Sequence, residues 1–233
     1  YIDDNATVFA NGNVAVQALS HFDTFHIDGN LGFAGKVGFG ASASTVIKND
    51  TTEAFIDAGA NVTGLGNGGT VGIYDGSLNA SDLPNRQQSR GVSVVAASFE
   101  VLDVIAGGAQ LAGKVGIAGS ATVNILNETT RAWIAAGATV NGNNTGANTG
   151  QDVVVRATDT TEILGIGGAV TLSGTAGIGA GADVATITKV TEASIGISAI
   201  VNANQNVILE ANSEEDITSV AGAASLSGNA AIN

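Results

Sequence analysis

Hydrophobic and polar residues alternate with a period of two along much of this chain. Runs such as "DVVVRA" (152–157), "AVTLSG" (169–174) and "EASIGIS" (192–198) mix β-branched residues with small ones. Such alternation places successive side chains on opposite faces of an extended strand. Helices are disfavoured because Gly and Thr recur throughout, and because runs such as "NVILEA" (206–211) lack apolar residues at helical spacing. The pattern therefore predicts an all-β protein.

A shorter rhythm within these strands predicts the kind of β fold. Residues 152–169, 170–188 and 189–205 each begin with a strand-like apolar run and are about 18 residues long. That length suits one turn of a parallel β-helix, with three short strands and three corners per coil. We therefore expect a solenoid in which each coil pairs with the coils before and after it, and in which inward Val, Ile, Leu and Ala stack into columns.

The chain also contains a longer sequence repeat. The segment "LGFAGKVGFGASASTVIKNDTTEAFIDAGANVT" (31–63) returns as "AQLAGKVGIAGSATVNILNETTRAWIAAGATVN" (109–141), and again more weakly at 170–202. Two sets of anchors keep the same register: Val14, Val92, Val153 and Val207, and Gly35, Gly113, Gly174 and Gly228. We read these glycines as corners that need a positive φ or lie against a neighbouring coil.

The anchors divide residues 1–233 into repeat units of one body. The units are 13–90, 91–151 and 152–205, with partial units at 1–12 and 206–233. Their unequal lengths are explained by extra residues at the end of a unit, chiefly the insertion 64–90, and insertions of this kind map to loops on one face. Tyr1 falls on Phe55 when the first residues are aligned with the repeat, so we expect a segment of a longer array. Unpaired strand edges at its ends predict end-to-end association.

Composition supports this architecture and excludes several functions. The chain is 44% hydrophobic but only 4% aromatic, with 33 Gly, one Pro and no Cys. Absence of Cys fits a secreted or surface-attached bacterial protein, so we expect an extracellular location. A net charge of −13 with 8 basic residues argues against nucleic-acid binding, and no apolar run is long enough for direct membrane insertion. We expect no cofactor, although acidic residues could hold Ca²⁺ loosely.

Several repeat phrases carry a family resemblance. They are "NDTTEAFIDAGANVT" (49–63), "NETTRAWIAAGATVN" (127–141) and "NVILEANSEEDITSVAGAASLSG" (206–228). They resemble the repeats of large bacterial exoproteins of the filamentous-haemagglutinin type, and look closest to leukotoxin-like giant surface proteins. The resemblance covers the chain except for 64–90, and it marks a repeat style rather than an activity. It implies a right-handed parallel β-helix, export from the cell, and roles in adhesion, biofilm or toxicity.

The insertion 64–90 is the first candidate binding element. It contains Tyr74, Asp75, Arg86 and Arg90, and Tyr and Arg are residue types favoured at contact hot spots. Loops that project from a rigid scaffold often carry recognition. We expect this loop to contact a receptor or glycan on a host or neighbouring cell, with adjacent repeats of the same protein as further partners. The alternative is a surface excursion that covers one face.

Two equivalent sequons, at Asn49 and Asn127, are candidate glycosylation sites. The alternative is that Asn–Thr pairs recur in a solenoid because they favour its corners.

The sequence lacks a recognisable catalytic pattern. Nucleophile-elbow, P-loop and zinc-helix motifs are all missing. Carboxylates gather at Glu210, Glu214, Glu215 and Asp216, but Lys189 is the one basic residue after Arg156. We predict a non-enzymatic, rod-like adhesin, biofilm or fibre component. The alternatives are a polysaccharide-active β-helix enzyme and a passenger segment of a secreted cytotoxin.

Overall fold

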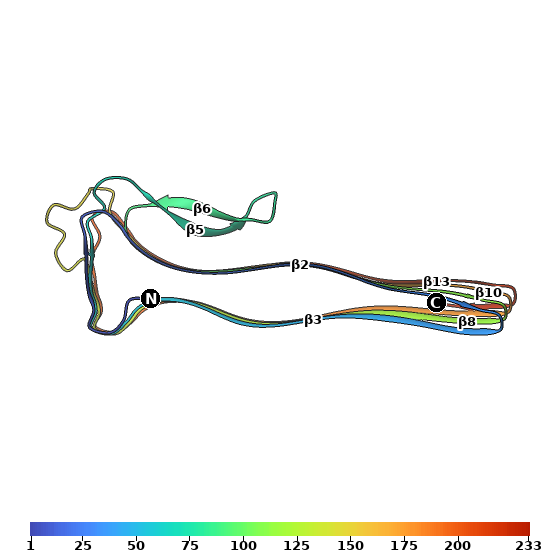
Figure 1. Ribbon diagram of the computed structural model, residues 1–233. Coiled ribbons are helices and arrows are strands. Elements are labelled where there is room, and N and C mark those ends of the chain that lie inside the picture. The colour runs from blue at the N-terminus through green and yellow to red at the C-terminus, as the bar shows by residue number, and fades with distance from the viewer.

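The computed structural model describes residues 1–233 as strands and turns, without helices. Each repeat forms two long strands joined by a tight turn and then, where the repeat is complete, a short strand (Figure 1). The strands are β1 (Thr7–Ala10), β2 (Val14–Ala34), β3 (Val37–Ile56), β4 (Asn61–Gly64), β5 (Val71–Leu78), β6 (Pro84–Ser89), β7 (Gly91–Ala112), β8 (Val115–Ile134), β9 (Thr139–Val140), β10 (Asp152–Ser173), β11 (Ala176–Ile195), β12 (Ile200–Val201), β13 (Val207–Ser227) and β14 (Ala230–Ile232). The predicted all-β class is confirmed.

Equivalent strands of successive repeats pair in parallel and build three sheets. Two sheets contain the long strands, in the orders β13-β10-β7-β2 and β14-β11-β8-β3, and the third joins the short strands β1-β4-β9-β12. In Figure 1 the repeats overlie one another, with the two long sheets facing each other and the short sheet across one end. The arrangement of parallel strands in stacked sheets is consistent with a β-solenoid.

The expected coil of about 18 residues is wrong. Val14 pairs with Val92, Val92 with Val153 and Val153 with Val207, so one turn of the chain takes a whole repeat. The expected boundaries between 18-residue coils, at 169/170 and 188/189, lie inside the long strands β10 and β11. Gly29 and Gly107 likewise pair with each other inside β2 and β7. Glycine in an extended strand does not force a corner, and the alternation continues through it.

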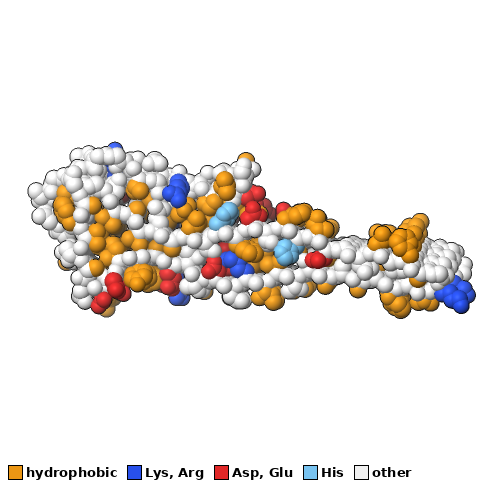
Figure 2. Space-filling view, viewed as in Figure 1, with side chains coloured by type: hydrophobic (Ala, Val, Ile, Leu, Met, Phe, Trp, Pro, Cys, Tyr) orange, Lys and Arg blue, Asp and Glu red, His pale blue; other side chains and the backbone are white.

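The large coil changes the shape of the molecule. A strand of 20 residues spans roughly 65 Å, whereas four stacked strands span only about 15 Å between their axes. The long dimension therefore follows the strands and not the stacking axis, and the molecule is elongated and narrows toward one end (Figure 2).

The space between the two long sheets changes in character along the strands. At the end closed by the short sheet, inward residues are apolar and fully buried, for example Val62, Val94 and Ile134. A second apolar cluster, which includes Leu102, Leu126 and Ile163, lies further along. Near the far turn most inward positions are Gly, Ala or Ser, with Gly38, Gly116 and Gly177 in register, and the buried Gln110 side chain lies against Gly38. Small residues allow the sheets to approach there, so this part forms a narrow arm.

The turns between the long strands depend on glycine. A Cβ on Gly113 would collide with the backbone carbonyl oxygen of Gly35 in the preceding coil, and one on Gly174 with that of Gly113. Neither glycine has a positive φ. Of the two reasons considered for these glycines, the structure therefore supports close approach of a neighbouring coil and not a left-handed backbone.

We expect Gly113→Ala to destabilise the protein by about 1 to 3 kcal/mol, because backbone must move to admit the methyl group. Gly107→Ala is the matched control: nothing lies near its added Cβ, and Ala should stabilise the strand by about 0.5 kcal/mol. Urea unfolding of the two variants measures the difference. Equal effects of the two substitutions would contradict the close-packed turn.

Candidate functional site

The insertion 64–90 folds into an antiparallel hairpin, β5–β6 (Figure 1). Its apolar residues Ile73 and Tyr74 pack on the outer face of the long sheet, against Val95, Phe99 and Val154. Because the hairpin covers that face, the first half of β7 is buried on both sides. The insertion does lie on one face, as expected, but it covers the scaffold instead of projecting from it.

The four candidate residues of this hairpin have different surroundings. Tyr74 is 8% exposed, and the Arg86 guanidinium lies 4.3 Å above its ring and donates a hydrogen bond to its hydroxyl (2.5 Å). Arg90 donates to the carbonyl oxygens of Gly66 and Gly68. Asp75 accepts hydrogen bonds from Ser77. Tyr74 and Arg90 thus hold the hairpin together, while Arg86 remains exposed to solvent.

Asn49 and Asn127 lie within β3 and β8, so the corner interpretation is wrong. Both side chains are exposed, and the Asn127 amide donates to Asn49 Oδ1 across the two coils (2.7 Å). They form a short amide ladder. An exposed amide is accessible to a modifying enzyme, although a glycan on either residue would remove part of this ladder.

A layer of charged residues lies between the two apolar clusters, inside the molecule. Lys48 Nζ is 2.9 Å from Glu128, 3.0 Å from Asp50 and 3.1 Å from Glu100. Lys189 Nζ is 2.6 Å from Asp159 and 3.3 Å from Glu215. Serine and threonine hydroxyls complete the layer; for example, Ser98 of the same strand and Thr161 of the neighbouring strand both donate to Glu100. We call this set the ionic layer.

The ionic layer holds more carboxylates than ammonium groups, and the pKa values of several of these carboxylates are shifted. Burial raises the pKa of Glu128 to about 7; Lys48 opposes this rise and the nearby Glu100 adds to it. Burial also raises the pKa of Asp159. Although burial opposes it, the hydrogen bond from Ser20 and the pairing with Lys48 lower the pKa of Asp50. Glu128 is thus a member of the layer whose charge changes near neutral pH.

Sequence reasoning missed this layer. Asp50, Glu128 and Lys189 occupy equivalent positions of successive repeats, and that alignment was available from the register. The sequence did not show that these three side chains point to the inner face of the sheet, because the expected 18-residue coil did not identify the inward positions. No group of three or more His, Cys, Asp or Glu side chains in the structure is arranged to hold a metal ion, so weak Ca²⁺ binding stays a prediction.

Three of the four acidic residues of the last repeat, Glu210, Glu214 and Asp216, alternate onto the outer face of β13, whereas Glu215 points inward. Glu210 pairs with Arg156 (2.9 Å) beneath the hairpin, and Glu215 belongs to the ionic layer. Arg156 and Lys189 are therefore both engaged in ion pairs.

A stack of aromatic rings crosses three coils on the outer face of β3 and β8. Tyr1 and Phe55 have ring centroids 4.8 Å apart, and Phe55 and Trp133 have centroids 4.3 Å apart, with nearly parallel planes. The equivalent position of the next coil is Ser194. Beside Trp133 lies a hollow of about 530 Å³, lined by Glu53, Arg131, Ala132, Trp133, Glu192 and Ser194.

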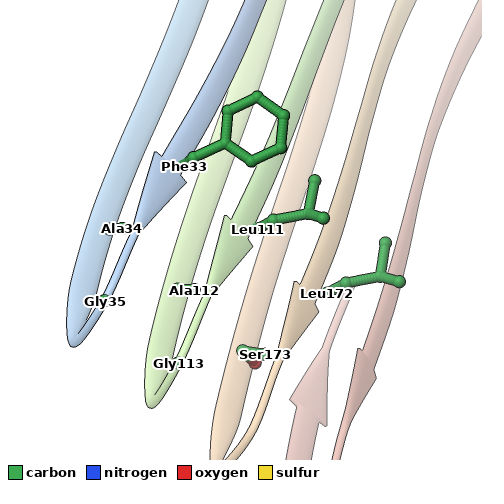
Figure 3. Close-up of a pocket in the computed structure, with 8 residues that line it drawn as sticks. All are labelled: Phe33, Ala34, Gly35, Leu111, Ala112, Gly113, Leu172 and Ser173. Atoms are coloured by element: carbon green, nitrogen blue, oxygen red, sulfur yellow. The ribbon is translucent and has the colours of Figure 1, made fainter.

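A second hollow, of about 570 Å³, lies at the tip of the narrow arm (Figure 3). Phe33, Leu111 and Leu172 stand side by side on neighbouring strands there and point to the same side. Phe33 is 72% exposed, and Figure 2 shows apolar side chains gathered near this end. A contiguous apolar surface of this kind is typical of a contact region.

Comparison with known proteins yields no relative for this chain. No protein-family model matches it, and no curated protein or solved structure matches it significantly. The structure contains no helix long and apolar enough to cross a membrane.

We expect acidification from pH 8 to pH 5 to stabilise the protein through Glu128. Burial raises the pKa of Glu128 in the folded state to about 7, from the usual 4.5. The folded state therefore binds more protons than the unfolded state between these pH values, and the stabilisation is lost as the pH rises through them. Glu128→Gln removes this titration. The wild type should lose stability between pH 5 and pH 8, whereas the variant should not. The free energy of unfolding of the variant, relative to that of the wild type, should therefore be up to about 3 kcal/mol more favourable at pH 8 than at pH 5.

Urea unfolding at the two pH values measures this difference, and Glu192→Gln, at an exposed carboxylate outside the layer, is the control. A pH-independent difference between wild type and Glu128→Gln would contradict a raised pKa.

Proposed function

We propose that this chain is a rod-like structural and adhesive segment of a secreted or surface-attached bacterial giant protein. The proposal includes a right-handed parallel winding and an extracellular location, as the repeat style implies. Its observational support is the in-register pairing of every long strand with the equivalent strand of the next repeat, across β2, β7, β10 and β13. Such pairing can be continued by further repeats without a change of geometry.

The mechanism of this function is geometric. Of 148 backbone hydrogen bonds, 114 lie within the strands, so stiffness comes mainly from pairing between coils. Side chains that a neighbouring coil would cover are exposed at the end: Val207 and Leu209 are inward residues, equivalent to the fully buried Val153 and Val155, yet are about half exposed. A further coil would bury them, and its backbone would pair with the free edge of β13.

The outer faces are available for contacts with other molecules. The exposed Arg86 of the hairpin, the hollow beside Trp133 and the apolar hollow at the arm tip lie on these faces and not between the sheets. A stiff body that holds such surfaces away from the cell suits recognition of a receptor or glycan on a host or neighbouring cell.

Association through the open end is the first test. We expect sedimentation velocity to show concentration-dependent oligomers, and Leu209→Lys to shift the protein toward monomer by at least tenfold in dissociation constant, because a coil stacked there would bury the added charge. Thr218→Lys, which faces outward on the same strand, should leave association unchanged. A wild-type protein that is monomeric at all concentrations would contradict the proposed stacking.

Adhesion is tested separately with beads that carry the purified protein. Under flow, they should be retained on cultured epithelial cells or bacterial lawns at several times the level of albumin-coated beads. Retention equal to that of albumin on both surfaces would remove the adhesive part of the proposal and leave the structural part standing.

A further inference from the structure

We infer that the hollow beside Trp133 is a binding site for one pyranose ring of a neutral glycan. The ring would stack on the free face of the Trp133 indole, in the position where the aromatic ladder ends. This inference rests on the proposed adhesive function, because it names the ligand class that such an adhesin would recognise.

The register of the coils creates the free face. Tyr1, Phe55 and Trp133 follow one another at the separation of adjacent coils, so each ring covers one face of the next. The coil after Trp133 presents Ser194 at this position, and a serine side chain is too short to cover an indole. One face of Trp133 is therefore packed against Phe55, while the other is left to the hollow.

Charged groups stand beside this free face. At the position two residues before the aromatic one, successive coils carry Glu53, Arg131 and Glu192 on the same outer face. Arg131 Nε is 3.4 Å from Glu192, and Arg131 Nη1 is 4.0 Å from Glu53, distances longer than those of tight ion pairs. Arg131 is 42% and Glu192 55% exposed, so guanidinium donors and carboxylate acceptors remain available at the rim.

This combination fits a sugar better than other ligands. A pyranose has an apolar C–H face and a rim of hydroxyls that both donate and accept, which matches an aromatic face beside Arg131 and Glu192. A nucleotide or an acidic glycan would be repelled by the two carboxylates of the rim and by the net charge of −13 of the chain. A cation is opposed by Arg131. An apolar aromatic ligand would cover the charged rim without hydrogen-bonding to it, which costs free energy.

The surface next to the hollow extends the site. A smaller depression of about 270 Å³ lies further along β8 and β11 and is lined by Asn127, Thr129 and Thr188 among others. Its amide and hydroxyl groups therefore lie on the same strands as the hollow, further along them. We therefore expect an oligosaccharide to bind more tightly than a single ring.

Trp133 is the single tryptophan of the chain, so its fluorescence reports directly on this site. We expect saturable changes on titration with methyl β-D-galactopyranoside or methyl β-D-glucopyranoside, with dissociation constants in the millimolar range that is typical of one weakly held ring. At least one glycoside should saturate, whereas p-cresol, an aromatic probe, should not.

Two variants test the position of the ring. Ser194→Phe keeps Trp133 but supplies the missing aromatic, so it should weaken glycoside binding at least tenfold while thermal stability is kept or raised. Thr45→Phe, which adds the same side chain to an exposed outward position of β3, should bind as wild type does. Arg131→Ala should weaken binding at least fivefold.

Three results would overturn the inference: no saturable change with either glycoside, saturation by p-cresol alone, or undiminished glycoside binding by Ser194→Phe. If bead retention and end-to-end association persist in such a case, only the glycan assignment fails. Loss of bead retention together with a normal titration would instead remove the adhesive function and leave the sugar site.

Discussion

Backbone pairing between equivalent strands of successive repeats is the interaction on which the rest of this structure depends. Because the strands are parallel and in register, each side chain has its own equivalents as neighbours, one coil separation away. The chemistry of the molecule is therefore arranged in ladders, and what a position does is decided by which residues the repeats place there. Divergence between repeats, rather than a special loop, creates the distinctive sites.

Ladders favour some side chains and penalise others. Aromatic rings stack well at this separation, as Tyr1, Phe55 and Trp133 do, and so do the amides of Asn49 and Asn127. Stacked like charges repel each other. The chain alternates sign where it stacks Glu53, Arg131 and Glu192, and it places Lys48 among Asp50, Glu100 and Glu128, with the pKa of Glu128 raised to about 7.

Inward-facing and outward-facing residues contribute differently to the structure. Inward positions run from an apolar end, through the ionic layer, to the small residues of the narrow arm, and they determine how closely the sheets approach. Outward positions of the middle coils have neighbours on both sides, so a missing side chain there leaves a bounded space. The hollow between Trp133 and Ser194 is such a space.

The sequence by itself determined the all-β class, the pairing register, the place of the insertion and the turn glycines, such as Gly113, because each is written in local alternation or in the repeat. It could not determine the length of a coil, since alternation passes through Gly29 and Gly107 without marking whether the strand ends. Only the tertiary structure decided which face of each strand points inward, and hence the ionic layer. It also decided that Ile73 and Tyr74 cover β7 and that Trp133 keeps one open face, because these depend on surfaces brought together from different repeats.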